Sequence, residues 1–450
     1  MAVLSTCTGL GYGLLSRQLN VLSPGTTDIF SPEPVQLQRT VLTGDLRKVP
    51  DIEQLDQSRD WPCLNGPRGD GTGLADGLEM NWPEEGPPVA WRVPSGKGYS
   101  SPVAFGDRVV LLLRESDEEI VRCLDLINGK TLWDFRYPTN FVCGSNYSSG
   151  PYSTPAISDG LVYSIGAEGK LHCLVLENGG HVWSRDLVSE FDVRTRIFGV
   201  GHSPSIWRDR VIINVGGSKP DSGILALDKR TGDLLWSATS FGASYATPTI
   251  AAPHGRDFAF VLCEEAIVAL TPEDGTVLWS MPFKPTVPDG ENAATPIVYG
   301  DLLMVCSYGT GTRCLQIDED GMYHPVWESR KQLTSQYISL LCIHGHVFGI
   351  HTDFSMRCVE LATGKVKWRK KVDAFLRSNQ ILVGDQIIVM GERGHLGLID
   401  ADPKQFQLRF LSKEPVLQVD GFLFQSPALS NGRLLVRSEQ ELVCFDLRKQ

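Results

Sequence analysis

The sequence has fewer basic residues than acidic ones. Its 450 residues carry 42 Lys and Arg against 53 Asp and Glu, which gives a formal net charge of −11 at pH 7. Binding to a nucleic-acid backbone needs a basic surface, so this balance argues against a nucleic-acid partner. Long apolar runs are missing too, and none approaches the roughly 20 residues that a membrane-spanning helix requires. We therefore expect neither a nucleic-acid partner nor a membrane span.

Paired cysteine motifs are absent as well. The 11 cysteines are odd in number, no two are adjacent, and none forms a Cys-x-x-Cys pair. This pattern argues against a metal ribbon or a redox pair. Residues 318–321 resemble the start of a calcium loop, but they fall at a hairpin position and the downstream Glu is missing. We predict no metal site, and buried free thiols of the kind more usual in a reducing compartment.

The amino-terminal region lacks the basic start that a secretory signal requires. Residues 1–19 contain one short, weakly apolar segment, and residues 20–58 are polar, contain proline and show no periodicity. We predict that residues 1–58 form a tail or linker, which could hold a weak targeting segment. Residues 59–450 are expected to form a single domain.

A repeated phrase organises that domain. Each copy starts with a small residue, has a glycine at the sixth following position and closes with a tryptophan at the tenth. The five clearest copies cover residues 123–133, 173–183, 226–236, 269–279 and 358–368. Two copies with longer turns cover residues 314–327 and 397–410, and an eighth begins at Cys444 just before the sequence ends.

A second phrase precedes each of these copies. It reads Ser or Thr, then Pro, then two aliphatic runs separated by a turn such as Gly-Asp or Asp-Gly, as in residues 154–166. The copies at residues 338–350 and 379–391 lack the Pro. Two hairpins per unit make four strands, and units of about 40 to 53 residues with four strands are typical of a β-propeller blade. We predict an all-β fold with eight four-stranded blades, in which residues 87–94 supply the outer strand that the last blade lacks.

The tryptophan phrase resembles a known family. Ala226, Asp228, Thr231, Gly232 and Trp236 match the tryptophan-docking repeat of the pyrroloquinoline-quinone-like (PQQ-like, quinoprotein-type) β-propellers. The resemblance implies that the closing tryptophans dock each blade on the next. These residues are Trp91, Trp133, Trp183, Trp236, Trp279, Trp327 and Trp368.

The segment WPCLNGPRGDGTG, residues 61–73, narrows the resemblance. It is similar to the opening of the PQQ-binding-like repeat propellers of planctomycete-type bacteria, although Leu64 stands where a Trp is usual. No Gly-Lys-Ser/Thr follows, so the segment is not a phosphate-binding loop. We interpret it as a strap that leads the chain onto the propeller, with Trp61 as its apolar anchor.

Two functions follow from the resemblance. Quinoprotein alcohol dehydrogenases use PQQ with Ca²⁺ and a disulfide between adjacent cysteines, whereas the barrel-assembly lipoprotein of Gram-negative outer membranes is similar in fold and binds no quinone. Because this chain has no adjacent cysteines and no motif for a base or calcium ligands, we predict a non-catalytic binding or scaffold propeller. It is expected to be a monomer without cofactor or catalytic residues, and to bind protein or peptide partners. A PQQ-dependent alcohol or sugar dehydrogenase is the alternative. Export to the cell envelope is implied by resemblance, with the cytoplasm as the alternative.

The candidate binding residues are those expected at the central mouth of the propeller. They lie just before the inner strand of each blade, or just beyond it in the case of Tyr308. Tyr and Asn side chains suit stacking and hydrogen bonding to a ligand. The alternative is that these side chains only fill the channel and bond to loop backbone. The candidates are Tyr99, Ser100, Tyr152, His202, Tyr245, Asn292, Tyr308, Tyr337 and Asn379.

Overall fold

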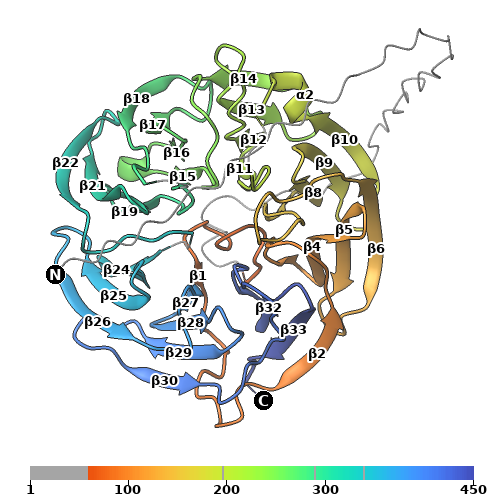
Figure 1. Ribbon diagram of the computed structural model, residues 1–450, viewed down its shortest axis with the longest axis vertical. Coiled ribbons are helices and arrows are strands. Elements are labelled where there is room, and N and C mark those ends of the chain that lie inside the picture. The colour runs from red at the N-terminus through yellow and green to blue at the C-terminus, as the bar shows by residue number, and fades with distance from the viewer. Residues whose placement is uncertain (1–58, 195–196, 288–289, 338–339, 450) are drawn as a thin grey trace, which may run out of the picture. The chain divides into compact units, whose positions relative to one another are not determined.

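Strands make up most of the regular structure in the computed structural model, which describes residues 59–194, 197–287, 290–337 and 340–449. They form eight sheets arranged around a central axis as the blades of a β-propeller (Figure 1). Every blade has four antiparallel strands, and blade 7 carries a fifth, parallel strand at its inner edge. The predicted all-β, eight-bladed fold is confirmed. The expected tail over residues 1–58 lies outside the described residues, and the single domain over 59–450 stays a prediction.

The innermost strand of each blade is short, with three residues in seven of the eight blades. Neighbouring inner strands contact one another around the axis, so there is little room for longer ones. In blades 1 to 8 the inner strands are β3 (Val103–Phe105), β7 (Ala156–Ser158), β11 (Ser205–Trp207), β15 (Thr249–Ala251), β19 (Ile297–Tyr299), β23 (Leu341–Ile343), β27 (Asn379–Val383) and β31 (Ala428–Ser430).

The two middle strands of each blade are covered on both faces by neighbouring blades, which explains their continuous aliphatic runs. The second strands are β4 (Arg108–Glu115), β8 (Leu161–Ile165), β12 (Arg210–Ile213), β16 (Phe258–Leu262), β20 (Leu302–Ser307), β24 (His346–Ile350), β28 (Gln386–Met390) and β32 (Arg433–Arg437). The third strands are β5 (Glu118–Asp125), β9 (Lys170–Val175), β13 (Ile224–Asp228), β17 (Ala266–Leu270), β21 (Gly311–Ile317), β25 (Ser355–Glu360), β29 (Leu396–Asp400) and β33 (Glu441–Asp446).

The outer strands show more exposed positions because one edge of each faces solvent. They are β6 (Thr131–Pro138), β10 (His181–Asp186), β14 (Leu234–Ala238), β18 (Val277–Pro282), β22 (Tyr323–Ser329), β26 (Val366–Lys371), β30 (Leu408–Leu411) and, in blade 8, β2 (Val89–Pro94). Helix is confined to the short α2 (Leu187–Phe191) and the 3₁₀ turn η1 (Pro253–Gly255) in the described residues. No helix in this part of the chain is long and apolar enough to cross a membrane.

Each blade except blade 7 docks on the next one through a tryptophan of its outer strand. The indole N–H of Trp236 donates a 3.1 Å hydrogen bond to the carbonyl of Pro272 in blade 4. Gly275 packs on the same ring, and its φ of +74° lies in the left-handed region that favours glycine. Blade 7 has Phe410 at this position, and Trp82 packs against its edge with ring centroids 5.4 Å apart. The other indole donors and their carbonyl acceptors are Trp91 to Leu126, Trp133 to Leu176, Trp183 to Lys229, Trp279 to Gly321, Trp327 to Leu361 and Trp368 to Asp402.

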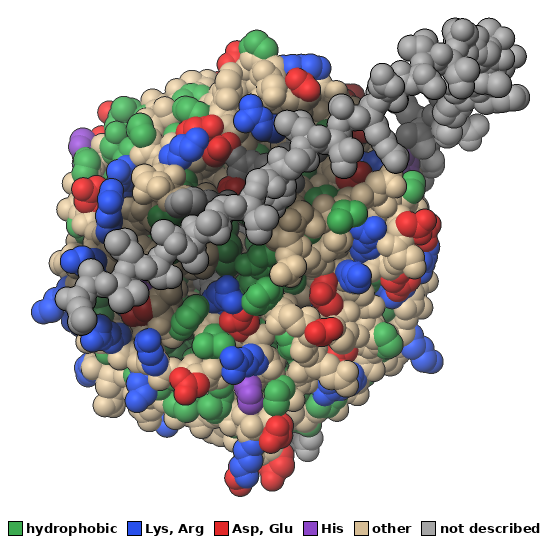
Figure 2. All heavy atoms as spheres, in the orientation of Figure 1, with side chains coloured by type: hydrophobic (Ala, Val, Ile, Leu, Met, Phe, Trp, Pro, Cys, Tyr) green, Lys and Arg blue, Asp and Glu red, His purple; other side chains and the backbone are tan. Residues whose placement is uncertain are grey.

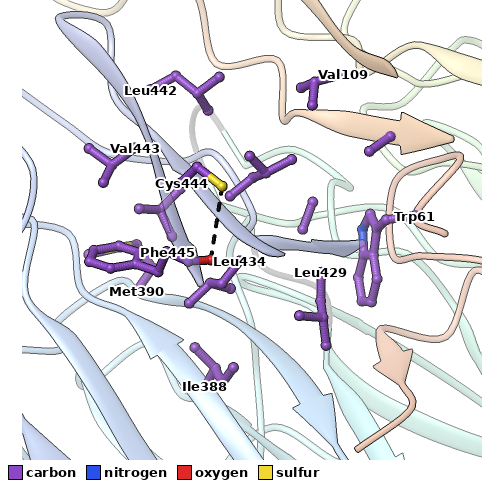
Figure 3. Packing of buried hydrophobic residues seen from close by; sticks show 14 of the residues in the cluster. Trp61, Val109, Ile388, Met390, Leu429, Leu434, Leu442, Val443, Cys444 and Phe445 are labelled. Atoms are coloured by element: carbon purple, nitrogen blue, oxygen red, sulfur yellow. Dashed lines mark hydrogen bonds between the residues drawn. The ribbon is translucent and has the colours of Figure 1, made fainter. Parts of the chain in front are cut away.

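The ring is closed by pairing the two ends of the described chain. β2 runs antiparallel to β33 and places Trp91 opposite Cys444, as the sequence predicted for the eighth blade. Cys444 and Phe445 pack into the hydrophobic core shared by blades 7, 8 and 1, and Trp61 lies beside Leu429 in the same core (Figure 3). The described cysteines are all free, and most of them are buried.

Residues 61–73, the strap, cross the centre of the ring. Trp61 is only 2% exposed and exchanges two backbone hydrogen bonds, of 2.9 and 2.8 Å, with Ala104 of blade 1. The carbonyl of Pro62 accepts a hydrogen bond from Ile157 of blade 2. At the other end, Gly71 packs against Leu341 of blade 6. Because blades 2 and 6 face each other across an eight-bladed ring, the strap spans the axis.

The last residues of the strap form β1 (Thr72–Gly73), which pairs in parallel with β27 near the centre of the ring (Figure 1). The Arg-Gly-Asp sequence precedes it and serves the turn itself. Asp70 accepts a hydrogen bond from the backbone of Thr72 at 2.9 Å and pairs with Arg68 at 3.2 Å. The strap is therefore a structural cross-brace in addition to an entry segment.

Candidate functional site

A cavity of about 140 Å³ lies on the propeller axis. In the space-filling view the centre of the ring is hollowed, and hydrophobic side chains lie in the hollow (Figure 2). The volume has room for roughly ten water molecules. All eight blades contribute to its wall, mainly through the segments that lead into the inner strands. The lining residues are Leu64, Tyr99, Ser101, Tyr147, Tyr152, Thr154, Phe198, Gly201, Ser203, Tyr245, Glu291, Ala293, Thr295, Tyr337, Asn379, Phe424 and Ser426.

A hydroxyl belt runs along part of this wall. The backbone N–H of Ser426 donates to Ser101 Oγ at 2.8 Å, that of Ser101 to Thr154 Oγ1 at 3.0 Å, and that of Thr154 to Ser203 Oγ at 2.9 Å. Ser203 continues the chain to Thr247 at 3.4 Å. Each belt residue precedes a proline, which holds it extended and fixes the direction of its N–H. The Ser/Thr-Pro pair of the repeat therefore links neighbouring blades around the cavity.

Aromatic rings form the rest of the wall. The ring centroids of Tyr99 and Tyr152 are 4.9 Å apart at 88°, and those of Tyr99 and Phe424 are 5.0 Å apart at 86°. Edge-to-face packing of this kind places the positive edge of one ring against the negative face of the next. The same arrangement continues through Tyr147 with Phe198, Phe198 with Tyr245 and Tyr337 with Phe424.

The tyrosine hydroxyls hold these rings in place. The hydroxyl of Tyr152 donates to the carbonyl of Ser148 at 3.0 Å, and the backbone N–H of Ser148 donates to the hydroxyl of Tyr99 at 3.2 Å. The side-chain amide of Gln336 donates to the hydroxyl of Tyr337 at 2.7 Å. Burial raises the pKa of Tyr99, Tyr152 and Tyr337, so all three stay neutral. The cavity is consequently lined by fixed, uncharged tyrosine rings.

Five of the nine residues predicted at the mouth line the cavity. They are Tyr99, Tyr152, Tyr245, Tyr337 and Asn379. The structure brings them together from blades that are far apart in sequence. Whether they bind a ligand stays a prediction.

The other four candidates do not line the cavity. Ser100 is fully buried and its carbonyl accepts from Arg437, while the side-chain amide of Asn292 donates to three backbone carbonyls of blade 4. Tyr308 is 38% exposed. His202 is 1% exposed, and neither ring nitrogen has a partner among the described residues. Burial lowers the pKa of His202 to about 4, so it stays uncharged near pH 7 and has no partner with which to act as a base.

Two groups of lining residues were missed by reasoning from the sequence. Tyr147, Phe198 and Phe424 lie in loops that belong to neither repeated phrase, so no spacing marked them. The belt residues were visible as the small residue before proline, but the pattern alone did not show that this position faces the axis.

The strap provides the floor of the cavity. Leu64 is a lining residue, and the strap bonds to the middle residues of β3 and β7 and to the end of β27, whereas the aromatic and belt residues precede the inner strands. The aromatic wall therefore surrounds one end of the channel, and the strap crosses it at the other. Cys63 next to this floor is half-buried, and its thiol donates to the carbonyl of Gly66 at 2.9 Å. Desolvation of the sulfur raises the pKa of this thiol to about 12, so it is not a ready nucleophile.

Charge in the cavity has one sign. Glu291 is the only charged residue that lines it within the described residues. Glu439 lies close to the wall and accepts hydrogen bonds from the backbone N–H of Gly98, at 2.7 Å, and from the hydroxyl of Ser148. Among described residues, the nearest cation on this aromatic cluster is Arg377, whose guanidinium lies 5.0 Å from the ring centroid of Phe422 and pairs with Glu392 at 2.7 Å.

The described lining residues lack the cationic partners that buried PQQ would need. The quinone is a planar anion with several carboxyl groups, which require cationic partners when buried. No Lys, Arg or Trp is among the described lining residues. The described part of the chain also holds no group of three or more His, Cys, Asp or Glu side chains that could hold a metal ion.

Comparison with known proteins agrees with the fold and the repeat. Together, the eight blades and the indole-to-carbonyl docking define the class of PQQ-like β-propellers. The profile of the family described as "Outer membrane protein assembly factor BamB" matches residues 116–370, which is more than half of the chain. The chain belongs to this family.

Solved structures and a curated relative are more distant. BamB from Moraxella catarrhalis has 18% identity and a TM-score of 0.57, and covers 80% of this chain and 98% of its own. A quinohemoprotein alcohol dehydrogenase from Comamonas testosteroni has 13% identity and a TM-score of 0.64, with 89% and 83% covered. A quinoprotein ethanol dehydrogenase from Pseudomonas aeruginosa is 23% identical in a match of 177 aligned positions, which covers 36% of this chain but only 27% of that protein. At these identities the likeness shows the fold alone.

Proposed function

We propose that this protein is a non-catalytic binding propeller that docks a peptide segment or small ligand in its central cavity. The observation that carries the proposal is the wall itself. Tyrosine rings fixed by their own hydroxyls and a belt of hydroxyls that accept backbone N–H groups provide a preformed concave surface, which is the usual character of a binding site.

The chemistry of the wall supports binding over catalysis. A general base needs a partner that orients it and a pKa near the working pH. His202 has neither, since burial lowers its pKa to about 4 and its ring nitrogens have no partner among described residues. Membership of the family described as an outer membrane assembly factor favours a protein or peptide partner.

A peptide selection tests the proposal. Peptides selected from a random library on the immobilised full chain would be titrated against the wild type and the variants Tyr337→Leu and Tyr299→Leu. Tyr337 lines the cavity, whereas Tyr299 lies outside it and is 40% exposed. We expect Tyr337→Leu to weaken binding at least about tenfold and Tyr299→Leu to leave it unchanged, because a buried aromatic anchor contributes more than about 1.4 kcal/mol. Equal affinity for both variants would contradict docking in the cavity.

The alternative function is a PQQ-dependent dehydrogenase, because the fold is similar to that of quinoprotein dehydrogenases. The full chain, supplied with PQQ and Ca²⁺, would be assayed for dye reduction with alcohols and aldose sugars. We expect no rate above that of heat-treated protein, because the cavity residues do not fit the quinone. Substrate-dependent dye reduction would replace the binding function with an oxidoreductase.

A further inference from the structure

We propose that the central cavity is an aromatic cage for a quaternary ammonium group, so that the ligand is anchored by a fully alkylated cation. The inference rests on the proposed binding function and names the chemistry that the site selects. The cation could belong to a free small molecule or to a trimethylated lysine of a peptide, and the two sources share the same head group.

The first step is the form of the wall. Rings of Tyr99, Tyr152 and Phe424 meet at angles of 86° to 88°, and Phe198 stands at 72° to Tyr245. These rings meet at near right angles around part of the cavity, whereas the rings of Tyr147 and Phe424 lie at 33° to each other. A cation near ring faces is attracted by their negative quadrupoles, and quaternary ammonium groups are recognised in this way by aromatic cages.

The second step is charge. Glu291 lines the cavity, Glu439 lies close to its wall, and no Lys, Arg or His lines it within the described residues. Glu439 interacts with the buried cation of Arg437, so Glu291 is the carboxylate that favours a cation over an anion in this largely apolar cavity. The net charge of the whole chain, −11, acts in the same direction at long range.

The cation of Arg377 already packs against this aromatic cluster. The guanidinium of Arg377 lies 5.0 Å from the centroid of Phe422 and 5.9 Å from that of Phe424, which itself lines the cavity. Arg377 forms an ion pair with Glu392 at 2.7 Å, which reduces its repulsion of a second cation. The cluster therefore has faces that hold a delocalised cation in the native fold.

A quaternary ammonium differs from other cations in having no N–H groups. A primary ammonium or guanidinium that enters a cavity must replace the water bound to its N–H groups with acceptors. The belt oxygens of Ser101, Thr154 and Ser203 each already accept one backbone N–H group, and the carbonyl of Ser148 accepts from Tyr152. Glu291 is the one charged acceptor among the described lining residues, and a single carboxylate replaces only part of the hydrogen bonds that an ammonium or guanidinium makes with water. An ammonium without N–H groups needs no such acceptors, and the rings can contact its methyl groups directly.

Calorimetric titration with matched probes tests the cage. Choline and 3,3-dimethylbutan-1-ol have the same shape, and only choline is charged. We expect choline to bind the full chain at least about tenfold more tightly than the neutral alcohol, since desolvated cation–π contacts with several rings add to one another. Equal affinities, or no binding of choline, would overturn the inference.

Two variants tie the preference to the cavity. Tyr152→Leu should lose choline binding while Tyr152→Phe, which keeps the ring, should retain most of it. Should Tyr152→Leu fold poorly, Glu291→Gln keeps the test decisive, because it removes the negative charge and keeps a side chain of similar size. It should weaken choline binding while leaving binding of the neutral alcohol unaffected. Choline binding that survives both Tyr152→Leu and Glu291→Gln would place the cation elsewhere and refute the cage.

The source of the cation is separated by a second pair of probes. A peptide with trimethyllysine is compared with the same peptide carrying unmodified lysine, next to free choline. Tighter binding of the trimethylated peptide than of choline indicates a peptide ligand, and the reverse order indicates a small molecule. If neutral peptides bind the cavity and cations do not, the inference fails but the proposed binding function stands. Dye reduction with PQQ and Ca²⁺ would instead remove the binding function itself.

Discussion

Gly275 shows how one residue sets the contact between two blades. Its φ of +74° belongs to the left-handed region, and a Cβ there would lie 2.6 Å from Cε3 of Trp236. Gly160 has nearly the same φ, +72°, but a Cβ there would meet nothing within 4 Å. Both glycines therefore have a left-handed backbone, but a docking indole lies above Gly275 alone of the two.

We predict that Gly275→Ala destabilises the protein more than Gly160→Ala does. Both variants pay about 1 kcal/mol for the left-handed backbone. Gly275→Ala also displaces the ring of Trp236, which adds about 1–3 kcal/mol of overpacking. Unfolding in urea, with Tm as a second measure, gives the difference. Equal losses would mean that the indole does not depend on the glycine.

His202 is the residue that gives the centre of the molecule a pH dependence. It is 1% exposed, and burial lowers its pKa from 6.5 to about 4. Between these two values the unfolded chain binds a proton that the folded chain does not. Stability is therefore fully present above pH 6.5 and is lost as the pH falls toward 4.

We predict that His202→Phe flattens this pH profile. At pH 5 protonation of the unfolded chain costs the wild type about 2 kcal/mol of stability relative to pH 7. The variant lacks this contribution whatever its stability at pH 7, so the comparison uses the difference between the two pH values. Free energies of unfolding from denaturant titrations at pH 7 and pH 5 measure it. The same pH dependence in both proteins would show that protonation of His202 does not differ between the folded and unfolded chains.

At the scale of elements, blades and loops differ in how far the sequence determines them. Repeats such as residues 226–236 predicted hairpins, docking turns and the closing strand, because each depends on contacts between residues near one another in sequence or at a fixed period. The wall of the cavity depends on loops of unequal length, and Tyr147 and Phe198 meet only because the ring brings their loops together. No local sequence pattern indicates that these two loops lie close together. The repeat spacing therefore predicted Tyr99 and Tyr152 but not Tyr147 or Phe198.

The strap illustrates the same limit. Its composition indicated a turn-rich segment with Trp61 as an anchor, and Trp61 is buried. Its path across the axis follows from partners more than 40 residues away at one end and about 300 away at the other, as the hydrogen bonds of Trp61 with Ala104 and of Gly71 with Leu382 show. The element could be recognised from sequence while its role could not.

We predict that Trp61→Ala loosens the strap at both ends. Truncating a fully buried aromatic side chain costs about 3–5 kcal/mol. Because the strap bonds to the amides of Ala104 and Leu382, both should exchange hydrogen faster in the variant, although they lie in blades 1 and 7. Exchange followed by mass spectrometry, with an amide of blade 4 such as Val268 as reference, measures this. Faster exchange at Ala104 alone would show that the strap does not act as one element.

At the scale of the whole molecule, stability depends on a closed ring. Blade 8 joins β2 to β33, so chain segments more than 300 residues apart share one sheet. Arg437 of β32 lies next to this seam and is 1% exposed. Its guanidinium donates to the carbonyls of Ser100, Leu112 at 3.0 Å and Gly96 at 3.0 Å, all in or leading to blade 1, and to the hydroxyl of Ser95 at 2.7 Å. Burial lowers its pKa to about 10, which still leaves it protonated at pH 7.

We predict that Arg437→Met weakens the closure of the ring as a whole. Methionine fills a similar volume but leaves the carbonyls of Ser100, Leu112 and Gly96 without their donor, and each orphaned group costs about 1–3 kcal/mol when buried. Arg208→Met is the control, because Arg208 is 62% exposed and its ion pair with Asp257 is worth at most about 1 kcal/mol. If closure is shared by all blades, the variant unfolds in one transition at lower denaturant, and protease cuts throughout the ring under conditions that spare the control. Cleavage confined to blades 8 and 1 would show instead that the seam opens locally, and that the remaining blades hold together without it.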